Sequence, residues 1–360
     1  MSAPTDTVNA SFDATKAEEF GGRLFEMLSS SVVVMMIDLA ARTGLLDTLA
    51  TGSGTSEDLA TRAGLQERYV RECLGSLVTA GIVDYDATTR TYSIPAEHAA
   101  CLTGGGPTDL APMTRMATVM APHVPAVATA FREGGGVPYE AFRPEFTVTM
   151  DLLSRGLLDG HLLQDILPTA GLVEQFRSGA RVADIGCGTG HAINLMAGEF
   201  PASAFTGFDF STEAIDAGRK EAAELGLSNA TFEVRDVSTL PAGSFDVVFA
   251  IDSIHDQRDP AGVLRAVHDA LAPGGTFVMI DIKANSALED NLDNPFAPLL
   301  YGVSTLHCMT VSLALGGAGL GTVWGEQTAR AMLAEAGFEV LAVHDVPDDP
   351  MDSVYVSRRD

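Results

Sequence analysis

The hydrophobic pattern changes its period partway along the chain. From Leu24 the apolar residues recur at helical spacing through Val32, Met36 and Leu46, which predicts one long or two consecutive amphipathic helices after a mobile lead-in of about 20 residues. The segments TSEDLATRAGL and QERYVRECLGSLVTAG predict two shorter helices, and IVDYD and TYSI predict a two-stranded wing. Helical segments followed by a hairpin predict a winged helix within residues 1–100.

From Gly179 onward, strand-like and helix-like patterns alternate. The strand-like runs are, in order, VADI, FTGFDF ending near Asp209, FEVRD ending at Asp236, FDVVFAI, TFVMIDI, LAVHDV and DSVYVSRR. This alternation predicts an α/β fold with a parallel, doubly wound sheet over residues 179–360. Residues 101–178 lie between the two patterns, and we expect them to form a helical bridge and substrate lid.

The segment RVADIGCGTG, residues 181–190, predicts a strand, a tight turn and the start of a helix. Gly186, Gly188 and Gly190 permit positive φ and let a ligand lie against the backbone. Dinucleotide-binding turns have the spacing GxGxxG, whereas these glycines follow GxGxG and Asp184 precedes them. A carboxylate at this place would repel a diphosphate, so a ligand that carries an ammonium group fits better.

The DxGxGxG loop resembles motif I of class I S-adenosylmethionine (SAM)-dependent methyltransferases. The resemblance implies a Rossmann-like, seven-stranded SAM methyltransferase domain whose last strand runs antiparallel. Asp209, 19 residues after Gly190, is placed to accept the ribose hydroxyls. Asp236 is placed to accept the adenine amino group, and Val237 to donate its backbone N–H to the ring. The expected cofactor site comprises Asp184, Gly186, Gly188, Gly190, Asp209, Phe210, Asp236, Val237 and Ile251.

Composition narrows the choice of partner. The formal charge is −26, from 22 basic and 48 acidic residues, which argues against nucleic acid and anionic membranes. The stretch from Ser31 to Leu46 is apolar but broken by Asp38 and Arg42, so we expect a buried helix there rather than a membrane span. The four cysteines form no CxxC pair, and the N-terminus lacks the pattern of a signal peptide. We expect a cytoplasmic protein with a small-molecule acceptor, and a homodimer formed through the N-terminal domain.

Candidate chemistry follows the fourth strand of the sheet domain. His255 and Asp256 match a His-Asp pair of small-molecule O-methyltransferases, in which the histidine takes the proton of a phenol or alcohol. The match is incomplete, because Gln257 stands where that family has a tryptophan.

A second interpretation adds His307, which follows the fifth strand. His255, Asp256 and His307 could form a 2-His-1-carboxylate site for non-haem iron or another divalent metal. This set is similar to that of bacterial 2-oxo acid C-methyltransferases of the phenylpyruvate type, which also carry a winged helix; here the second histidine lies 52 residues after the first. The resemblance implies that the metal chelates the 2-oxo acid and stabilises its enolate for attack on the methyl group.

These patterns lead to ranked predictions. The first is a SAM-dependent methyltransferase that uses a metal to methylate the β-carbon of a 2-oxo acid. The second is an O-methyltransferase of a small hydroxylated metabolite with His255 as the general base. The third, from a different class, is a winged-helix transcriptional regulator.

Overall fold

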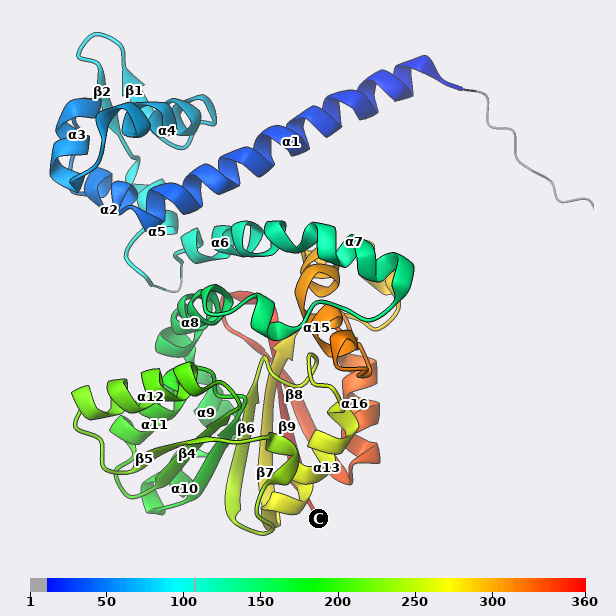
Figure 1. Cartoon of the computed structure of the whole chain (residues 1–360). Helices are drawn as coiled ribbons and strands as arrows, with labels where there is room; N and C mark the ends of the chain where they lie inside the picture. Colours follow the sequence, from blue (N-terminus) through cyan, green and yellow to red (C-terminus); the bar gives the residue numbers. More distant parts are fainter. Residues whose placement is uncertain (1–11, 107) are drawn as a thin grey trace, which may run out of the picture. The chain divides into compact units, whose positions relative to one another are not determined.

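The structure is a computed structural model that describes residues 12–106 and 108–360. It divides into two compact units between Thr103 and Gly104 (Figure 1). The predicted bridge therefore belongs, from Gly104 onward, to the same compact unit as the sheet domain.

The first unit is a winged helix, as predicted. Thr55 begins the third helix with a capping box to Asp58, and Gly64 ends that helix in the left-handed conformation. Leu46, Leu59 and Leu74 are fully buried in the centre of this unit. Its elements are α1 (Ala14–Arg42), α2 (Leu45–Ala50), α3 (Ser56–Ala63), α4 (Glu67–Thr79), the hairpin strands β1 (Asp84–Asp86) and β2 (Thr91–Ser93), and α5 (Ala96–Leu102).

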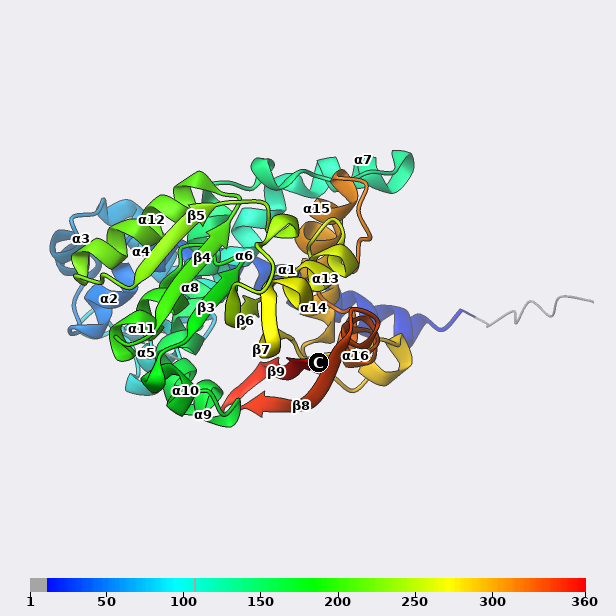
Figure 2. The same cartoon turned by 90° about the horizontal axis from the view of Figure 1, so that it is seen from below.

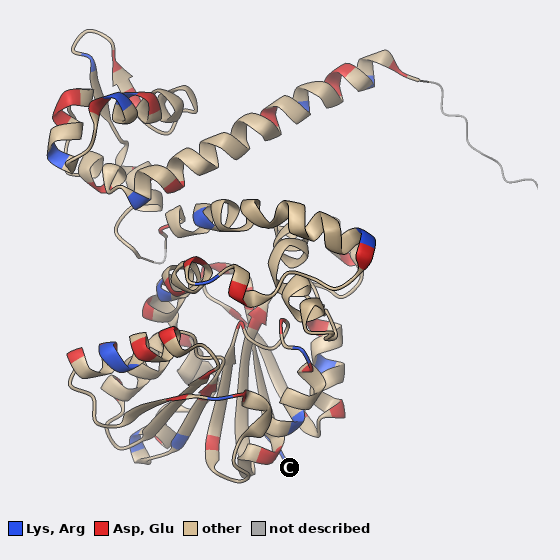
Figure 3. Cartoon of the chain, viewed as in Figure 1, with Lys and Arg blue, Asp and Glu red and all other residues tan. Residues whose placement is uncertain are grey.

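Helix α1 corrects two expectations. It begins at Ala14 with Asp13 as its N-cap, so only residues 1–11 of the predicted lead-in lie outside the described residues. Its buried residues are Ile37, Asp38 and Ala40, because only its C-terminal end packs on the winged-helix core. The expectation of a buried helix from Ser31 to Leu46 therefore holds only in part, since residues 31–36 are exposed or half-buried. Figure 3 shows a long uncharged stretch in the middle of this helix. By length and composition alone, α1 and the stretch Ala297–Ala314 are each apolar enough to cross a membrane.

The second unit contains the sheet. Its helices are α6 (Ala111–Met120), α7 (Val124–Glu133), α8 (Glu145–Leu157), α9 (Leu167–Thr169), α10 (Val173–Ser178), α11 (His191–Glu199), α12 (Thr212–Glu224), α13 (Pro260–Ala270), α14 (Ala297–Val303), α15 (Met309–Ala314) and α16 (Gly325–Glu335). Its strands are β3 (Arg181–Ile185), β4 (Ala204–Asp209), β5 (Ala230–Val234), β6 (Phe245–Ile251), β7 (Leu271–Ile282), β8 (Phe338–Val346) and β9 (Asp349–Arg359). Two π-helical segments, Leu158–Ile166 and Ser304–Cys308, interrupt the helices.

The seven strands lie in the order β5-β4-β3-β6-β7-β9-β8. Neighbours from β5 to β7 pair in parallel, and β9 pairs antiparallel with both β7 and β8. This confirms the predicted sheet with an antiparallel last strand. The chain order reverses between β3 and β6, and crevices at such reversal points are the usual ligand sites of open α/β sheets.

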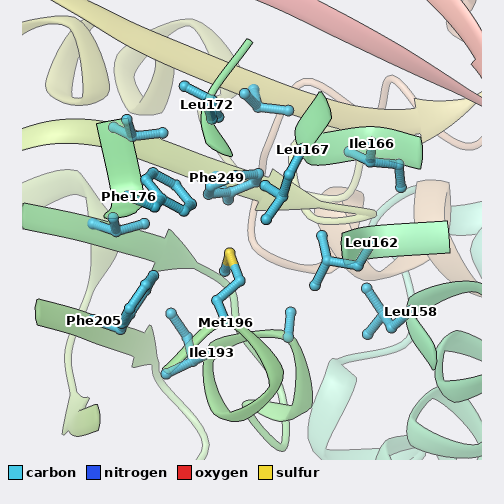
Figure 4. Close-up of a cluster of buried hydrophobic side chains, with 14 of the residues drawn as sticks. Leu158, Leu162, Ile166, Leu167, Leu172, Phe176, Ile193, Met196, Phe205 and Phe249 are labelled. Atoms are coloured by element: carbon cyan, nitrogen blue, oxygen red, sulfur yellow. The ribbon is translucent and has the colours of Figure 1, made fainter. Parts of the chain in front are cut away.

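Helices cover both faces of the sheet (Figure 2). Alternate residues of β6 show why: Val247 and Phe249 join the core under α10, α11 and α12, whereas Val248 and Ala250 join the core under α13 and α16. Figure 4 shows the first of these cores, in which Phe249 and Phe176 lie among apolar side chains of the π-helical segment and α11. A parallel sheet buried on both faces fits the near-continuous apolar strands of the sequence.

Candidate active site

The Gly-rich turn lies at the reversal point of the sheet, directly after β3. Gly186, Gly188 and Gly190 all have positive φ, at 67°, 53° and 72°. A Cβ atom at Gly186 would lie 2.6 Å from the Cβ of Ser253, and one at Gly190 would lie 2.1 Å from Cε1 of Phe232. The first and third positions therefore require glycine for space as well as for backbone conformation.

Asp209 ties the end of β4 to this turn. Its Oδ2 accepts a hydrogen bond from the backbone N–H of Gly188 at 2.9 Å, and its Oδ1 accepts one from Ser211 at 2.8 Å. Burial raises the pKa of Asp209 although both hydrogen bonds oppose the shift. Each carboxylate oxygen keeps a further lone pair, so the predicted bond to a ribose can form while the turn is held. That role stays a prediction.

Asp184 lies beside Asp209 and is 2% exposed. Its Oδ1 has no hydrogen-bond partner among the described residues. Burial, followed by the charge of Asp209, raises the pKa of Asp184 well above its usual value. A cationic ligand would relieve both effects, because a nearby positive charge favours the ionised carboxylate. SAM carries a sulfonium and an ammonium group, so this charge arrangement suits it.

The adenine side of the expected site differs slightly from the prediction. β5 ends at Val234 rather than at Asp236, because the Asp236 side chain accepts a hydrogen bond from Ser238 N–H and starts a short 3-10 turn at Val237. Phe210 is 54% exposed directly after β4. Ile251 ends β6, on the other side of the reversal point. All these predicted residues thus lie at one edge of the sheet.

His255 forms a buried pair with an acid that sequence reasoning missed. Its Nδ1 lies 2.8 Å from Oδ1 of Asp281, near the end of β7. The same oxygen accepts hydrogen bonds from Trp324 Nε1 at 3.1 Å and from the backbone N–H of Ile282 at 2.8 Å. His255 is 4% exposed and Asp281 1%. A signal was present, since TFVMIDI places an acid near the end of an otherwise apolar strand.

Charge decides the protonation of this pair. Burial is the largest single effect and lowers the pKa of His255. The charge of Asp281, the neighbouring Cys308 and the hydrogen bonds to both together outweigh burial, so the pKa rises well above its usual value. Burial also raises the pKa of the neighbouring Asp256 to about 6. His255 is thus oriented by a carboxylate that stabilises its protonated form, which is the arrangement of a general base.

The predicted metal ligands do not gather as one compact set. Within residues 12–106 and 108–360, three possible ligand atoms lie within 4.8 Å of one another at Asp252, His255 and Asp281. His307 lies in the π-helical segment Ser304–Cys308, is 1% exposed, and has no hydrogen bond at either ring nitrogen within the described part of the chain. The set of His255, Asp256 and His307 stays a prediction.

A polar network joins the predicted bridge to the Gly-rich turn, and the sequence did not reveal it. Asp151 of α8 accepts a hydrogen bond from the hydroxyl of Thr189 and pairs with Arg155 at 3.0 Å. Arg155 Nη1 in turn lies 2.9 Å from His191 Nδ1 and 3.0 Å from Glu221 Oε1. The network fixes α8 against the start of α11 and against α12.

Comparisons with known proteins agree with this geometry. Residues 176–337 match the family model of a methyltransferase domain, and residues 31–104 match that of the Rv2258c-like winged helix-turn-helix domain. The structure of mitomycin 7-O-methyltransferase MmcR has a TM-score of 0.66 at 21% identity, over 96% of this chain and 100% of the other. Human N-acetylserotonin methyltransferase, solved with SAM, has a TM-score of 0.67 at 18% identity, over 97% and 99%. These likenesses establish the class I methyltransferase fold.

Two sequence relatives each match about a third of this chain. A ubiquinone biosynthesis O-methyltransferase of Psychrobacter cryohalolentis is 32% identical over 130 residues, which are 35% of this chain and 49% of that protein. Aklanonic acid methyltransferase DauC of Streptomyces sp. strain C5 is 33% identical over 126 residues, 34% of this chain and 57% of that protein. The chain thus spans about half the length of these relatives. The chain contains a methyltransferase domain and, before it, an Rv2258c-like winged helix-turn-helix domain.

Proposed function

We propose that this protein transfers the methyl group of SAM to an oxygen atom of a small molecule, with His255 as the general base. The observation that carries the proposal is the buried hydrogen bond between His255 Nδ1 and Asp281 at 2.8 Å. It fixes the ring and directs Nε2, the other ring nitrogen, away from the carboxylate. The O-methyltransferase alternative of the sequence analysis thus takes precedence over C-methylation.

The reaction needs an acceptor oxygen about 3 Å from the sulfonium methyl group and in line with its bond to sulfur. His255 would take the hydroxyl proton as the oxygen attacks, and the C–S electrons would return to sulfur, leaving S-adenosylhomocysteine. Asp281 would stabilise the imidazolium that forms. Asp184 and Asp209 would hold the cationic donor on the other side of the reversal point.

The test is product analysis after incubation with SAM labelled on its methyl group and a panel of small phenols, alcohols and 2-oxo acids. A methyl ether that forms with the wild type and not with His255→Asn supports the proposal. Label found only on carbon, or an ether yield that His255→Asn leaves unchanged, contradicts it.

Metal-assisted C-methylation of a 2-oxo acid is the second candidate, and His307 favours it. Two unpartnered nitrogens on a buried imidazole suit a metal ligand, and His255 and Asp256 would complete the set. Because Asp281 occupies Nδ1 of His255, only Nε2 is left for an ion. When bound, a metal would act as a Lewis acid on the keto oxygen. Stoichiometric metal in the purified wild type, lost in His307→Ala, would support this function; chelator-insensitive methylation by metal-free protein would exclude it.

The charges of the winged helix favour a role other than DNA binding. Residues 31–100 contain 5 basic and 9 acidic residues, a balance of 5 − 9 = −4. On α4, Arg68 pairs with Glu72 and Arg71 with Glu67, so both bases of the would-be recognition helix are neutralised. Phosphate attraction needs uncompensated bases. A mobility shift with duplex DNA at physiological salt would contradict this proposal.

We also propose that α1 forms a homodimer with a second copy of the chain. Its exposed apolar side chains include Phe20, Leu24, Phe25, Met27, Leu28 and Val32. Sedimentation equilibrium should give a dimer for the wild type and a monomer for Phe25→Glu/Leu28→Glu, whose charges would lie in the interface. A wild-type monomer that binds neutral phosphatidylcholine vesicles would contradict the proposal and point to a membrane instead.

A further inference from the structure

At position 307 an apolar ring would pack better than the buried imidazole that is present. The ring of His307 stacks on Phe146 with ring centroids 3.5 Å apart and an angle of 13°, and it meets the edges of Phe142 and Tyr139. Neither ring nitrogen has a hydrogen-bond partner among the described residues. A buried polar group that is left unpaired destabilises the folded state. Phenylalanine would fill the same space without that cost.

His307 lies close to the proposed base. Burial and, after it, the charge of His255 lower the pKa of His307, and the thiol of the next residue, Cys308, interacts with His255 directly. Both residues belong to a π-helical segment, and such segments occur frequently at functional sites. The two ring nitrogens of His307, which are unpaired within the described residues, therefore lie on the acceptor side of the site. A bound molecule could supply their missing hydrogen bonds there.

Two of the three rings around His307, Tyr139 and Phe142, come from a segment that also contacts the donor side. In this cover segment, residues 134–144, Tyr139 lies 5.3 Å from the ring of Phe210, next to Asp209, and Arg143 pairs with Glu213 at the start of α12. The ring of Tyr139 contacts both Phe210 on the donor side and, at 5.7 Å, the ring of His307. Burial raises the pKa of Tyr139 to about 12, and the charges of Asp209 and Asp256 add to the shift. The walls around His307 are thus aromatic faces and edges.

The opposite end of the cover segment is fixed to α15. Val137 donates its backbone N–H to Thr310 Oγ1 at 3.0 Å, and a Cβ atom at Gly136 would lie 1.8 Å from the carbonyl oxygen of Thr310. The cover segment is therefore held at both ends, while Tyr139 and Phe142 between them belong to a single 3-10 turn and the residue that ends it. A bound ring could displace these two side chains without unfolding a helix or strand.

We propose that His307 determines acceptor specificity: it forms a hydrogen bond to a second oxygen on a planar aromatic acceptor whose first oxygen is methylated next to His255. This rests on the proposed O-methyltransferase function. The aromatic walls favour a flat ring, which can stack as Phe146 stacks on His307. Both ring nitrogens of His307 are unpartnered within the described residues, so one can donate to a carbonyl and the other can accept from a hydroxyl. The acceptor class is a phenol that carries a further ring oxygen.

The test compares binding of catechol with phenol, and of 1,2-dihydroxynaphthalene with 1-naphthol, by calorimetry in the presence of S-adenosylhomocysteine. The wild type should prefer the compound with two oxygens by about ten- to a hundredfold, and His307→Phe should abolish that preference while keeping the stack. His307→Gln should restore part of it. The matched control is His123→Phe, since His123 contacts Phe142 at 4.1 Å in the same aromatic cluster, and this variant should keep the full preference.

Melting curves and SAM affinity complete the experiment. His307→Phe should melt no lower than the wild type and bind SAM unchanged, whereas a structural role would lower the melting temperature. The inference is overturned if His307→Phe keeps the preference, if no ring compound binds the wild type, or if purified wild type holds one equivalent of metal that His307→Phe loses. Tight binding without turnover of any bound phenol would instead contradict the O-methyltransferase function and leave the acceptor preference intact.

Discussion

The donor half of the candidate site, around Gly186–Gly190, and the acceptor half, around His255, hold their ligands by different means. In the donor half, the expected SAM site consists of the backbone of the Gly-rich turn and two acids near strand ends, Asp184 and Asp209. These residues all lie within 26 consecutive positions. In the acceptor half, His255, Asp281 and His307 come from three separate segments and depend on buried side-chain contacts.

This difference predicts which property of the protein a substitution in each half should change. Changes in the donor half should alter stability and SAM affinity, because the turn is a close-packed piece of the fold. Changes in the acceptor half should alter turnover and selectivity, because its polar groups sit in a core that would pack as well without them. A substitution in one half that changes the property assigned to the other half would show that the two halves are not independent.

The largest effect should come from removing the proposed base. His255→Ala should lower kcat by about a hundredfold to ten-thousandfold, the usual range for a general base, and leave the calorimetric affinity for SAM unchanged. His268→Ala is the control, since His268 lies on α13 beside Asp269 and takes no part in the site. If SAM affinity falls together with turnover, His255 supports the fold and the division between the two halves fails.

The next effect concerns the turn itself. Gly190→Ala should lower the free energy of unfolding by about 3 kcal/mol, because the added methyl group would meet Phe232 and the residue has φ of 72°. Gly188→Ala should cost only about 1 kcal/mol, since Gly188 shares the positive φ but no atom of the described residues lies within 4 Å of the new Cβ. Urea denaturation measures both, and Phe232→Leu should recover part of the Gly190→Ala loss. Equal losses for the two glycines would refute the steric argument.

The features of the donor half could be predicted from the sequence more fully than those of the acceptor half. The period of the hydrophobic pattern is a local property, so the winged helix, the alternating strands and the Gly-rich turn are predictable from consecutive residues. The position of Asp209 at the end of a strand beside the turn is predictable too, from the consecutive residues FTGFDF. Its bond to a ribose stays a prediction. The start of α1 at Ala14 and the exposure of its apolar residues were not predicted. The hydrophobic pattern shows that a helix is amphipathic, but not whether its apolar side chains are covered within the same chain.

Asp281 and the surroundings of His307 depend on tertiary contacts. The strand TFVMIDI shows an acid, but only the adjacency of β6 and β7 brings it to His255. The stack of Phe146 on His307 joins residues 161 positions apart, 307 − 146, and no periodic signal links them. A metal set inferred from spacing could not anticipate that Nδ1 of His255 is already engaged.

A smaller effect should follow removal of the ribose acid. Asp209→Ala should weaken SAM binding by about 2 kcal/mol, roughly thirtyfold, because charge-assisted hydrogen bonds to the ribose are lost. Turnover at saturating SAM should change little, which separates this variant from His255→Ala. Asp216→Ala is the control, because Asp216 is an exposed residue of α12 that pairs only with Arg219 in the described structure. Unchanged SAM affinity by calorimetry would show that Asp209 only holds the turn.

The smallest effect tests the pair at the centre of the acceptor half. Because Asp281 raises the pKa of His255, the neutral, proton-accepting form predominates only above that raised pKa, and turnover in the wild type should rise with pH through it. Asp281→Asn removes the charge, so the pKa of His255 falls and the acidic limb of the pH profile should move to lower pH. On the alkaline plateau kcat should fall about tenfold, since a hydrogen bond to a charged group is worth about 1.5 kcal/mol. Asp256→Asn serves as the comparison: it leaves the pair intact and should shift the limb less. An acidic limb that Asp281→Asn leaves in place would mean that another group takes the proton.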